Sequence, residues 1–193
     1  MGWKEYTAEL SSLLDLVDIH KVQNLVDAIE DVYRQDRCIF IIGNGGSAAN
    51  ASHLCEDLGK GTLADLQDQP RLRIASLTDN VSYILAWAND EGYERIFVEQ
   101  LKNLARPGDL LLAISGSGNS ANILRAVEWA RANSVHTFGI CGFDGGELVH
   151  LAHQSLRVPS HNMGIVETIH SAVFHWLMDK LHSRFSEMAG INV

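Results

Sequence analysis

The chain has 193 residues, a usual length for one domain and enough to bury a sizeable apolar core. Hydrophobic residues make up 46% of it and charged residues 20%, which excludes an intrinsically disordered chain. Its 15 Lys and Arg against 24 Asp and Glu give a net charge of −9, which argues against holding nucleic acid by bulk charge. No apolar run approaches the roughly 20 residues of a membrane span, and no signal peptide is visible. We therefore expect a cytoplasmic protein with no nucleic-acid or membrane partner.

The first 35 residues carry apolar side chains at helical spacing, which predicts one or two helices with Asp18 breaking or capping between them. We expect residues 1–35 to pack on the sheet domain formed by residues 36–193, or on a partner subunit, with both parts forming one structural unit. Residues 38–42 are five consecutive apolar residues, as in a strand buried on both faces. A glycine-rich turn and a helix at 48–58 follow.

This strand–helix pattern repeats along the rest of the chain. Further strands are predicted at residues 72–77, 110–114, 137–141 and 155–158. Further helices are predicted at residues 78–88, 94–104, 121–132 and 165–185, with a short one after the turn at 142–146. Strands that alternate with helices through short connections predict an α/β fold with a five-stranded parallel sheet, doubly wound by helices on both faces. The three cysteines, Cys38, Cys55 and Cys141, form no CxxC pair and are expected to be buried thiols.

Two loops rich in Gly and Ser, residues 43–47 and 115–120, leave separate strands at the edge where such sheets bind ligands. Each leads into a helix, whose free N–H groups and positive dipole end favour an anion. The second loop holds three serines and predicts a phosphate site. The alternative is a pair of tight turns with N-caps. This alternative is less favoured, because two such loops occur at equivalent positions. Neither loop has a nucleotide-binding spacing.

His53 and Asp57 lie four residues apart on the helix after the first loop, so they share one face. Glu56 is the rival carboxylate, and such a pair is often only a surface hydrogen bond. A second group on the last predicted helix comprises Glu167, His170 and His175. Histidines and carboxylates together suit zinc or another first-row divalent metal.

Helix geometry separates two members of that second group. Glu167 and His175 are about 12 Å apart along a helix, with an angular offset of about 80°. Either these side chains lean toward each other, or they belong to sites completed by different chains. The remaining histidines are expected to be surface or structural, and they are His20, His136, His150, His153, His161 and His182.

These motifs together resemble the sugar isomerase (SIS) family, and within it the phosphoheptose isomerase branch. The resemblance covers about residues 36–182. It rests on residues 43–47, His53, residues 88–90, residues 115–120, residues 142–146, residues 167–170 and His175. It implies a flavodoxin-like SIS fold and isomerisation of sedoheptulose 7-phosphate to D-glycero-D-manno-heptose 7-phosphate through a cis-enediol. It also implies a homotetramer with active sites between subunits, and a bound divalent metal, with zinc as the first candidate.

The resemblance also implies roles for individual residues. Substrate-binding positions are Asn44, Gly45, Gly46, Ser47, Asn89, Asp90, Ser115, Gly116, Ser117, Ser120 and Glu167. Metal-binding positions are His53, Asp57, Glu167 and His175. We assign Asp57 as the catalytic base and His175 as the catalytic acid.

The chain departs from the family pattern at four places. It has Asp57 where Glu is usual, Glu167 where Gln is usual, Gly116 where Thr is common, and Gly164-Ile165 where an Asp-Arg pair is usual. Two carboxylates and two neutral histidines would balance a 2+ ion, so we expect the metal to be retained. An isomerase of a different phosphosugar stays open as an alternative.

Two rivals belong to other functional classes. One is a non-catalytic scaffold that resembles the DnaA initiator-associating factor, which lacks a carboxylate four residues after the histidine. The chain keeps Asp57 and His175, which favours the enzyme. The other is a sugar-phosphate sensor, in which the SIS domain is fused to a DNA-binding module, and no such module is recognisable here.

Overall fold

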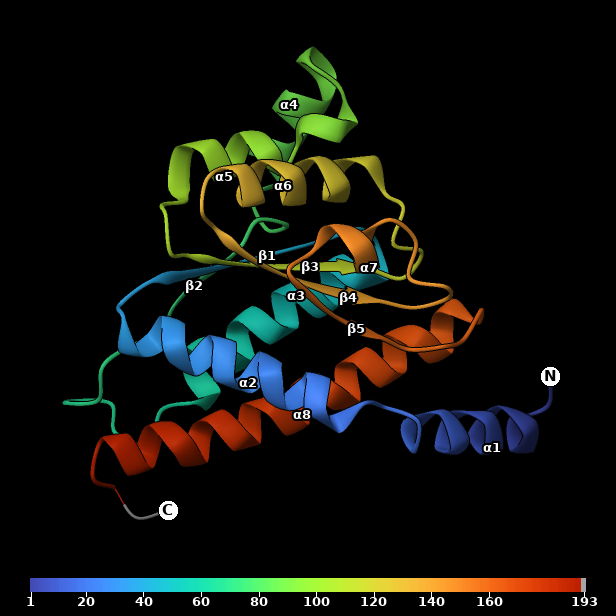
Figure 1. Ribbon diagram of the computed structural model, residues 1–193, viewed down its shortest axis with the longest axis horizontal. Coiled ribbons are helices and arrows are strands. Elements are labelled where there is room, and N and C mark those ends of the chain that lie inside the picture. The colour runs from blue at the N-terminus through green and yellow to red at the C-terminus, as the bar shows by residue number, and fades with distance from the viewer. Residues whose placement is uncertain (192–193) are drawn as a thin grey trace.

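The computed structural model describes residues 1–191, and in that range it has a five-stranded sheet with helices on both faces (Figure 1). The strand order is β2-β1-β3-β4-β5, and all neighbouring strands are parallel. The strands are β1 (Cys38–Gly43), β2 (Arg73–Ser76), β3 (Leu110–Ser115), β4 (His136–Cys141) and β5 (Gln154–Arg157). This order is the flavodoxin-like doubly wound arrangement, so the predicted fold class is confirmed.

Alternate side chains of each central strand enter two separate cores. Ile39 and Ile41 of β1 face a core with the long helices, whereas Phe40 and Ile42 face the opposite core. The first face is covered by α2 (Ile19–Arg34), α3 (Gly46–Glu56) and α8 (Met163–Met188). The second face is covered by α5 (Val98–Leu104), α6 (Ala121–Ala132) and α7 (Leu148–Leu151). Burial on both faces explains why these strands are apolar without alternation.

The N-terminal segment forms two helices, α1 (Trp3–Leu14) and α2. As expected, Asp18 caps α2, since its side chain accepts hydrogen bonds from the N–H groups of His20 and Lys21. Helix α2 joins the core under the sheet, whereas α1 buries only Leu13 and lies at one end of the molecule (Figure 1). The division of the chain at residue 35 stays a prediction.

Two predicted helices have different limits in the structure. The helix expected at 48–58 is α3, which continues as a π-helical turn, η1 (Asp57–Gly61). The helix expected at 94–104 is split into η2 (Tyr93–Arg95) and α5. The three consecutive residues 96–98 are all buried, and one straight helix cannot turn three successive side chains to the same face. Helix α4 (Val81–Asp90) precedes η2 and has no buried residue.

Only one of the three cysteines is fully buried, which corrects the expectation for the other two. Cys141 is buried, and burial raises the pKa of its thiol to about 11. Cys38 and Cys55 are half-buried. In residues 1–191 no helix combines the length and the apolar character needed to cross a bilayer.

Candidate active site

The second loop, residues 115–120, is a rigid turn between β3 and α6. The N–H of Gly118 donates to the carbonyl of Ser115 at 3.0 Å, and the N–H of Gly142 donates to the carbonyl of Gly116 at 2.9 Å. Gly118 has φ +68°, and a Cβ there would overlap the carbonyl of Gly145. Glycine is therefore required at this position, both for its backbone conformation and for the close approach.

The N-terminus of α6 leaves hydrogen-bond donors free beside this loop. Ser120 is the N-cap residue, but its side chain makes no capping bond. Within residues 1–191, the N–H groups of Ala121 and Asn122 have no acceptor. The hydroxyls of Ser115 and Ser120 lie 3.4 Å apart, and Ser117 is half-buried next to them. Free N–H groups, hydroxyls and a helix dipole in one place form a site suited to phosphate.

The first loop, residues 43–47, is filled by side chains of the protein itself. The amide of Asn44 is paired with the amide of Asn122 by hydrogen bonds of 2.9 and 2.8 Å. The carboxylate of Glu167 lies against Gly46, where a Cβ would overlap it. Ser47, in the first turn of α3, is buried. The two similar loops therefore offer a ligand different surfaces.

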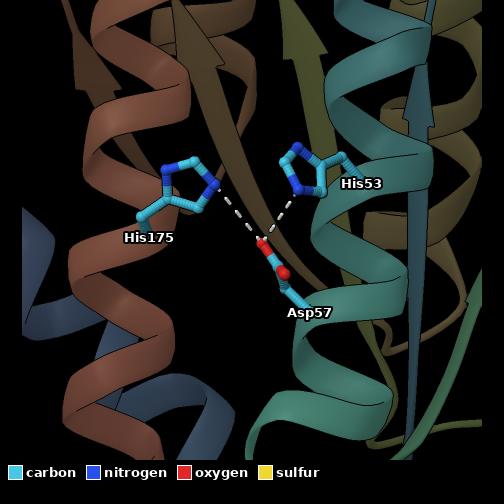
Figure 2. A group of neighbouring side chains, drawn as sticks. All are labelled: His53, Asp57 and His175. Atoms are coloured by element: carbon cyan, nitrogen blue, oxygen red, sulfur yellow. Dashed lines mark ion pairs between the residues drawn. The ribbon is translucent and has the colours of Figure 1, made fainter.

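Three side chains meet between α3, η1 and α8 (Figure 2). Asp57 Oδ2 lies 3.5 Å from His53 Nε2 and 3.7 Å from His175 Nε2. This oxygen is buried, and no residue in the described range hydrogen-bonds to it. The side chains of His53 and His175 are 51% and 53% exposed, so the cluster opens to solvent on the histidine side.

The geometry of this cluster fits a divalent metal ion. Zinc takes nitrogen and oxygen ligands at about 2.0–2.2 Å, which places neighbouring ligands of a tetrahedral site about 3.4 Å apart. The two Asp57–histidine distances are close to that spacing, and one donor atom from each of the three residues lies within 4.8 Å of the others. The buried Asp57 Oδ2 accepts no hydrogen bond in the described range, and a bound cation would satisfy it. Three protein ligands would leave the fourth position of a tetrahedral ion open.

Glu167 does not join the other three predicted metal ligands. Helices α3 and α8 run side by side in the same direction, so Glu167 lies beside Gly46 while His175 lies beside His53, about two turns further on. The two residues do not lean toward each other. Three of the four predicted metal ligands therefore lie together, and Glu167 lies apart from them.

The structure also decides between the two candidate carboxylates. Glu56 is exposed and lies 3.9 Å from Lys60, whereas Asp57 faces the histidines.

His170 belongs to the interior and not to this cluster. It is fully buried and its Nε2–H donates to the carbonyl of Cys141 at 3.2 Å. Burial lowers the pKa of His170 to about 4, so the ring is neutral. The expected grouping of Glu167, His170 and His175 is wrong, because the three side chains leave α8 toward three different neighbours.

Asn89 and Asp90, also predicted to bind substrate, are exposed at the end of α4. Asn89 Nδ2–H donates to Asp90 Oδ1 at 2.7 Å, and within residues 1–191 neither side chain hydrogen-bonds to the two loops. Asn122 and Tyr93, which hydrogen-bond to Asn44, were not predicted from the sequence. The one available signal was a polar residue, Asn122, in the first turn of a helix that follows a phosphate-type loop.

Comparisons with known proteins agree with this arrangement. A family model described as the SIS domain matches residues 5–142. A probable phosphoheptose isomerase of Thermoplasma acidophilum is 32% identical over 185 residues, covering 96% of this chain and all of that protein. The phosphoheptose isomerase of Mycobacterium tuberculosis is 37% identical over 175 residues, covering 90% of this chain and 88% of that protein. The solved phosphoheptose isomerase of Neisseria gonorrhoeae superposes with a TM-score of 0.85 at 27% identity, covering 93% of this chain and 96% of that chain.

Proposed function

The chain belongs to the SIS domain family, and from this we propose that it is a phosphoheptose isomerase, converting sedoheptulose 7-phosphate to D-glycero-D-manno-heptose 7-phosphate. Relatives of that name match almost the full length of both chains. One structural observation carries the proposal: an open, donor-lined serine loop and a His–Asp–His cluster occur in the same fold. An aldose–ketose isomerase needs both a place for the phosphate and groups that move protons.

The second loop would hold the phosphate at the end of the substrate that does not react. The hydroxyls of Ser115, Ser117 and Ser120 and the free N–H groups of Ala121 and Asn122 supply neutral donors for its oxygens. Binding energy from this remote group positions the reacting carbons.

The Asp57 and His175 side chains would transfer the protons. A carboxylate oxygen of Asp57 removes the proton from the carbon beside the carbonyl, which gives the cis-enediol. In the site without a metal, His175 exchanges a proton with the substrate oxygens through Nε2. Returning the proton to the neighbouring carbon completes the isomerisation.

The same three residues would instead hold a divalent ion, with zinc as the first candidate, through the Nε2 atoms of His53 and His175 and Oδ2 of Asp57. His175 would then act as a ligand and not as the proton donor. When bound, the ion would stabilise negative charge on the enediolate oxygens. Asp57 can hold it through Oδ2 and keep Oδ1 for the proton. Elemental analysis of protein purified without chelator, before and after dialysis against EDTA, tests this part. Zinc that is present and removed together with activity supports it, whereas full activity without metal leaves Asp57 and His175 as an acid–base pair alone.

We further propose a homotetramer whose active sites lie between subunits. Helix α4 is largely apolar yet has no buried residue, and Val81 and Leu85 on it are each 62% exposed. Helix α4 ends in the exposed pair Asn89 and Asp90, which a neighbouring subunit could use. On α1, Trp3 is 77% exposed. Light scattering that finds an active monomer would contradict the shared sites.

Incubation with sedoheptulose 7-phosphate, followed by NMR, tests the activity. We expect the resonances of a new aldose 7-phosphate. No turnover of this or any other ketose phosphate would favour a non-catalytic scaffold, and turnover of a different ketose phosphate alone would change the substrate but keep the reaction.

We place the reaction in the cytoplasm, because a doubly charged sugar phosphate does not cross a membrane unaided.

A further inference from the structure

Asn44 and Asn122 form a closed pair of amides across the binding edge of the sheet. Asn44 Nδ2–H donates to Asn122 Oδ1 at 2.9 Å, and Asn122 Nδ2–H donates to Asn44 Oδ1 at 2.8 Å. The hydroxyl of Tyr93 donates to the same Asn44 oxygen at 3.1 Å. The amide of Asn44 is therefore engaged on both its oxygen and its nitrogen.

This amide pair connects the beginnings of two helices with different tasks. Asn44 lies two residues before α3, which carries His53 and leads directly into Asp57. Asn122 lies in the first turn of α6, whose N-terminus borders the serine loop. The pair is thus a direct link between the segment that would move protons and the segment that would hold the phosphate.

We propose that Asn122 and Tyr93 are positioning residues, which hold Asn44 and thereby fix α3 relative to the phosphate-binding end of α6. This inference rests on the proposed isomerase function. Under this proposal, the Asn44 side chain does not bind the substrate, because its amide is hydrogen-bonded to Asn122. The phosphate and the reacting carbons belong to one small molecule, so the distance between their two binding places must stay constant during turnover.

The burial of Asn122 explains why the link is firm. The residue is 2% exposed, and its Oδ1 also accepts the N–H of Ile123 at 3.0 Å. Removing Asn44 takes two hydrogen bonds from the buried Asn122 amide and leaves its Nδ2–H groups without an acceptor in the protein, which is costly. The paired geometry is therefore favoured over alternatives in which each side chain turns toward solvent.

Three variants of the full chain test the link: Asn44→Ala, Asn122→Ala and the double variant. We expect each single variant to lower kcat by roughly 10- to 100-fold, as a misplacement of reacting groups would. We expect the double variant to lose no more than either single one, because both changes break the same link. Affinity for inorganic phosphate should stay unchanged in all three. Tyr93→Phe should have a smaller effect of the same kind.

Asn133→Ala is the matched control, since Asn133 lies just beyond the other end of α6 and is exposed, and within the described chain its side chain bonds only to the Trp129 carbonyl. It should leave kcat unchanged. Additive losses in the double variant would overturn the proposal. So would weaker phosphate binding in Asn44→Ala alone, because Asn44 would then contact the ligand.

A second readout separates this proposal from the proposed function. Slow hydrogen exchange of the Asn44 side-chain NH2 group, measured by NMR, should be present in the unmodified protein and lost in Asn122→Ala. Persistence of the slow exchange in that variant would overturn the link, whether or not the protein turns over sedoheptulose 7-phosphate. If the protein proves inactive while the exchange behaves as expected, the proposed function fails and the link between the helices stands.

Discussion

The two loops at the binding edge have similar compositions but different surroundings. Both follow a central strand and lead into a helix, and both contain glycine with positive φ. At the first loop, Asn44 is paired with Asn122 and the Glu167 carboxylate lies against Gly46. At the second loop, the N–H groups of Ala121 and Asn122 have no acceptor in residues 1–191.

This difference shows that a Gly- and Ser-rich loop before a helix is not by itself an anion site. The helix dipole and the free N–H groups exist in both places, but at the first loop a carboxylate already lies at the beginning of the helix. A phosphate there would meet a like charge. We therefore propose that the first loop positions α3 with Asp57, and that the second loop binds the phosphate.

The largest expected effect is a loss of catalysis without a loss of phosphate binding. Asp57→Asn should lower kcat by about 10²- to 10⁴-fold, because the amide cannot act as a base. Affinity for inorganic phosphate should not change, because the serine loop is a separate element. Steady-state kinetics and phosphate titration measure the two quantities. Glu56→Gln, at the exposed neighbouring residue, is the control and should leave both unchanged. Equal activity in Asp57→Asn would remove Asp57 from the mechanism.

The next effect concerns the rigidity of the second loop. Gly118→Ala should destabilise the protein by roughly 1–2 kcal/mol through its positive φ and by about 1–3 kcal/mol more through overlap with the Gly145 carbonyl. Gly45→Ala has the same kind of φ but no atom within 4 Å of the added Cβ, so only the first contribution applies. Denaturant unfolding of both variants compares them. Equal losses would mean that Gly145 does not brace the second loop.

Lowering the pH should destabilise the region beneath the second loop. His170 donates a hydrogen bond to the Cys141 carbonyl. Gly142, which follows Cys141, donates its N–H to the carbonyl of Gly116 in the second loop. Burial lowers the pKa of His170 from 6.5 to about 4, so the unfolded chain binds the proton first. The free energy of unfolding should therefore fall as the pH drops from 6.5 toward 4, by about 3 kcal/mol in total.

His170→Gln keeps a donor for the Cys141 carbonyl but does not titrate. Denaturant unfolding at several pH values should show a shallower acid dependence in this variant than in the unmodified protein. The same dependence in both proteins would assign the acid sensitivity to other groups.

The smallest of these effects distinguishes the serines of the two loops. Ser117→Ala should weaken phosphate binding by roughly 1.5–3 kcal/mol, the usual value of a hydrogen bond to a charged group. Ser47→Ala, in the first loop, should leave phosphate binding unchanged. Isothermal titration with inorganic phosphate measures both. The reverse result would place the phosphate at the first loop.

The sequence predicts the local features of this molecule and misses what depends on packing between distant segments. The five strands, both loops and the Asp18 cap follow from patterns within a few residues. The pairing of His53 with Asp57 also follows, because helical spacing is local. The position of Glu167 does not, since it depends on α8 lying parallel to α3. Asn122 was missed because a buried amide pair between residues 78 positions apart has no local pattern.

The most decisive measurement is the location of bound phosphate. Backbone amide resonances of the 15N-labelled full chain would be followed by NMR during titration with inorganic phosphate. We expect large shifts at Ser117, Ala121 and Asn122, where the N-terminus of α6 is open. We expect little change at Gly45 and Gly46, beside the Glu167 carboxylate. Shifts confined to Gly45 and Gly46 would contradict the division of tasks between the two loops.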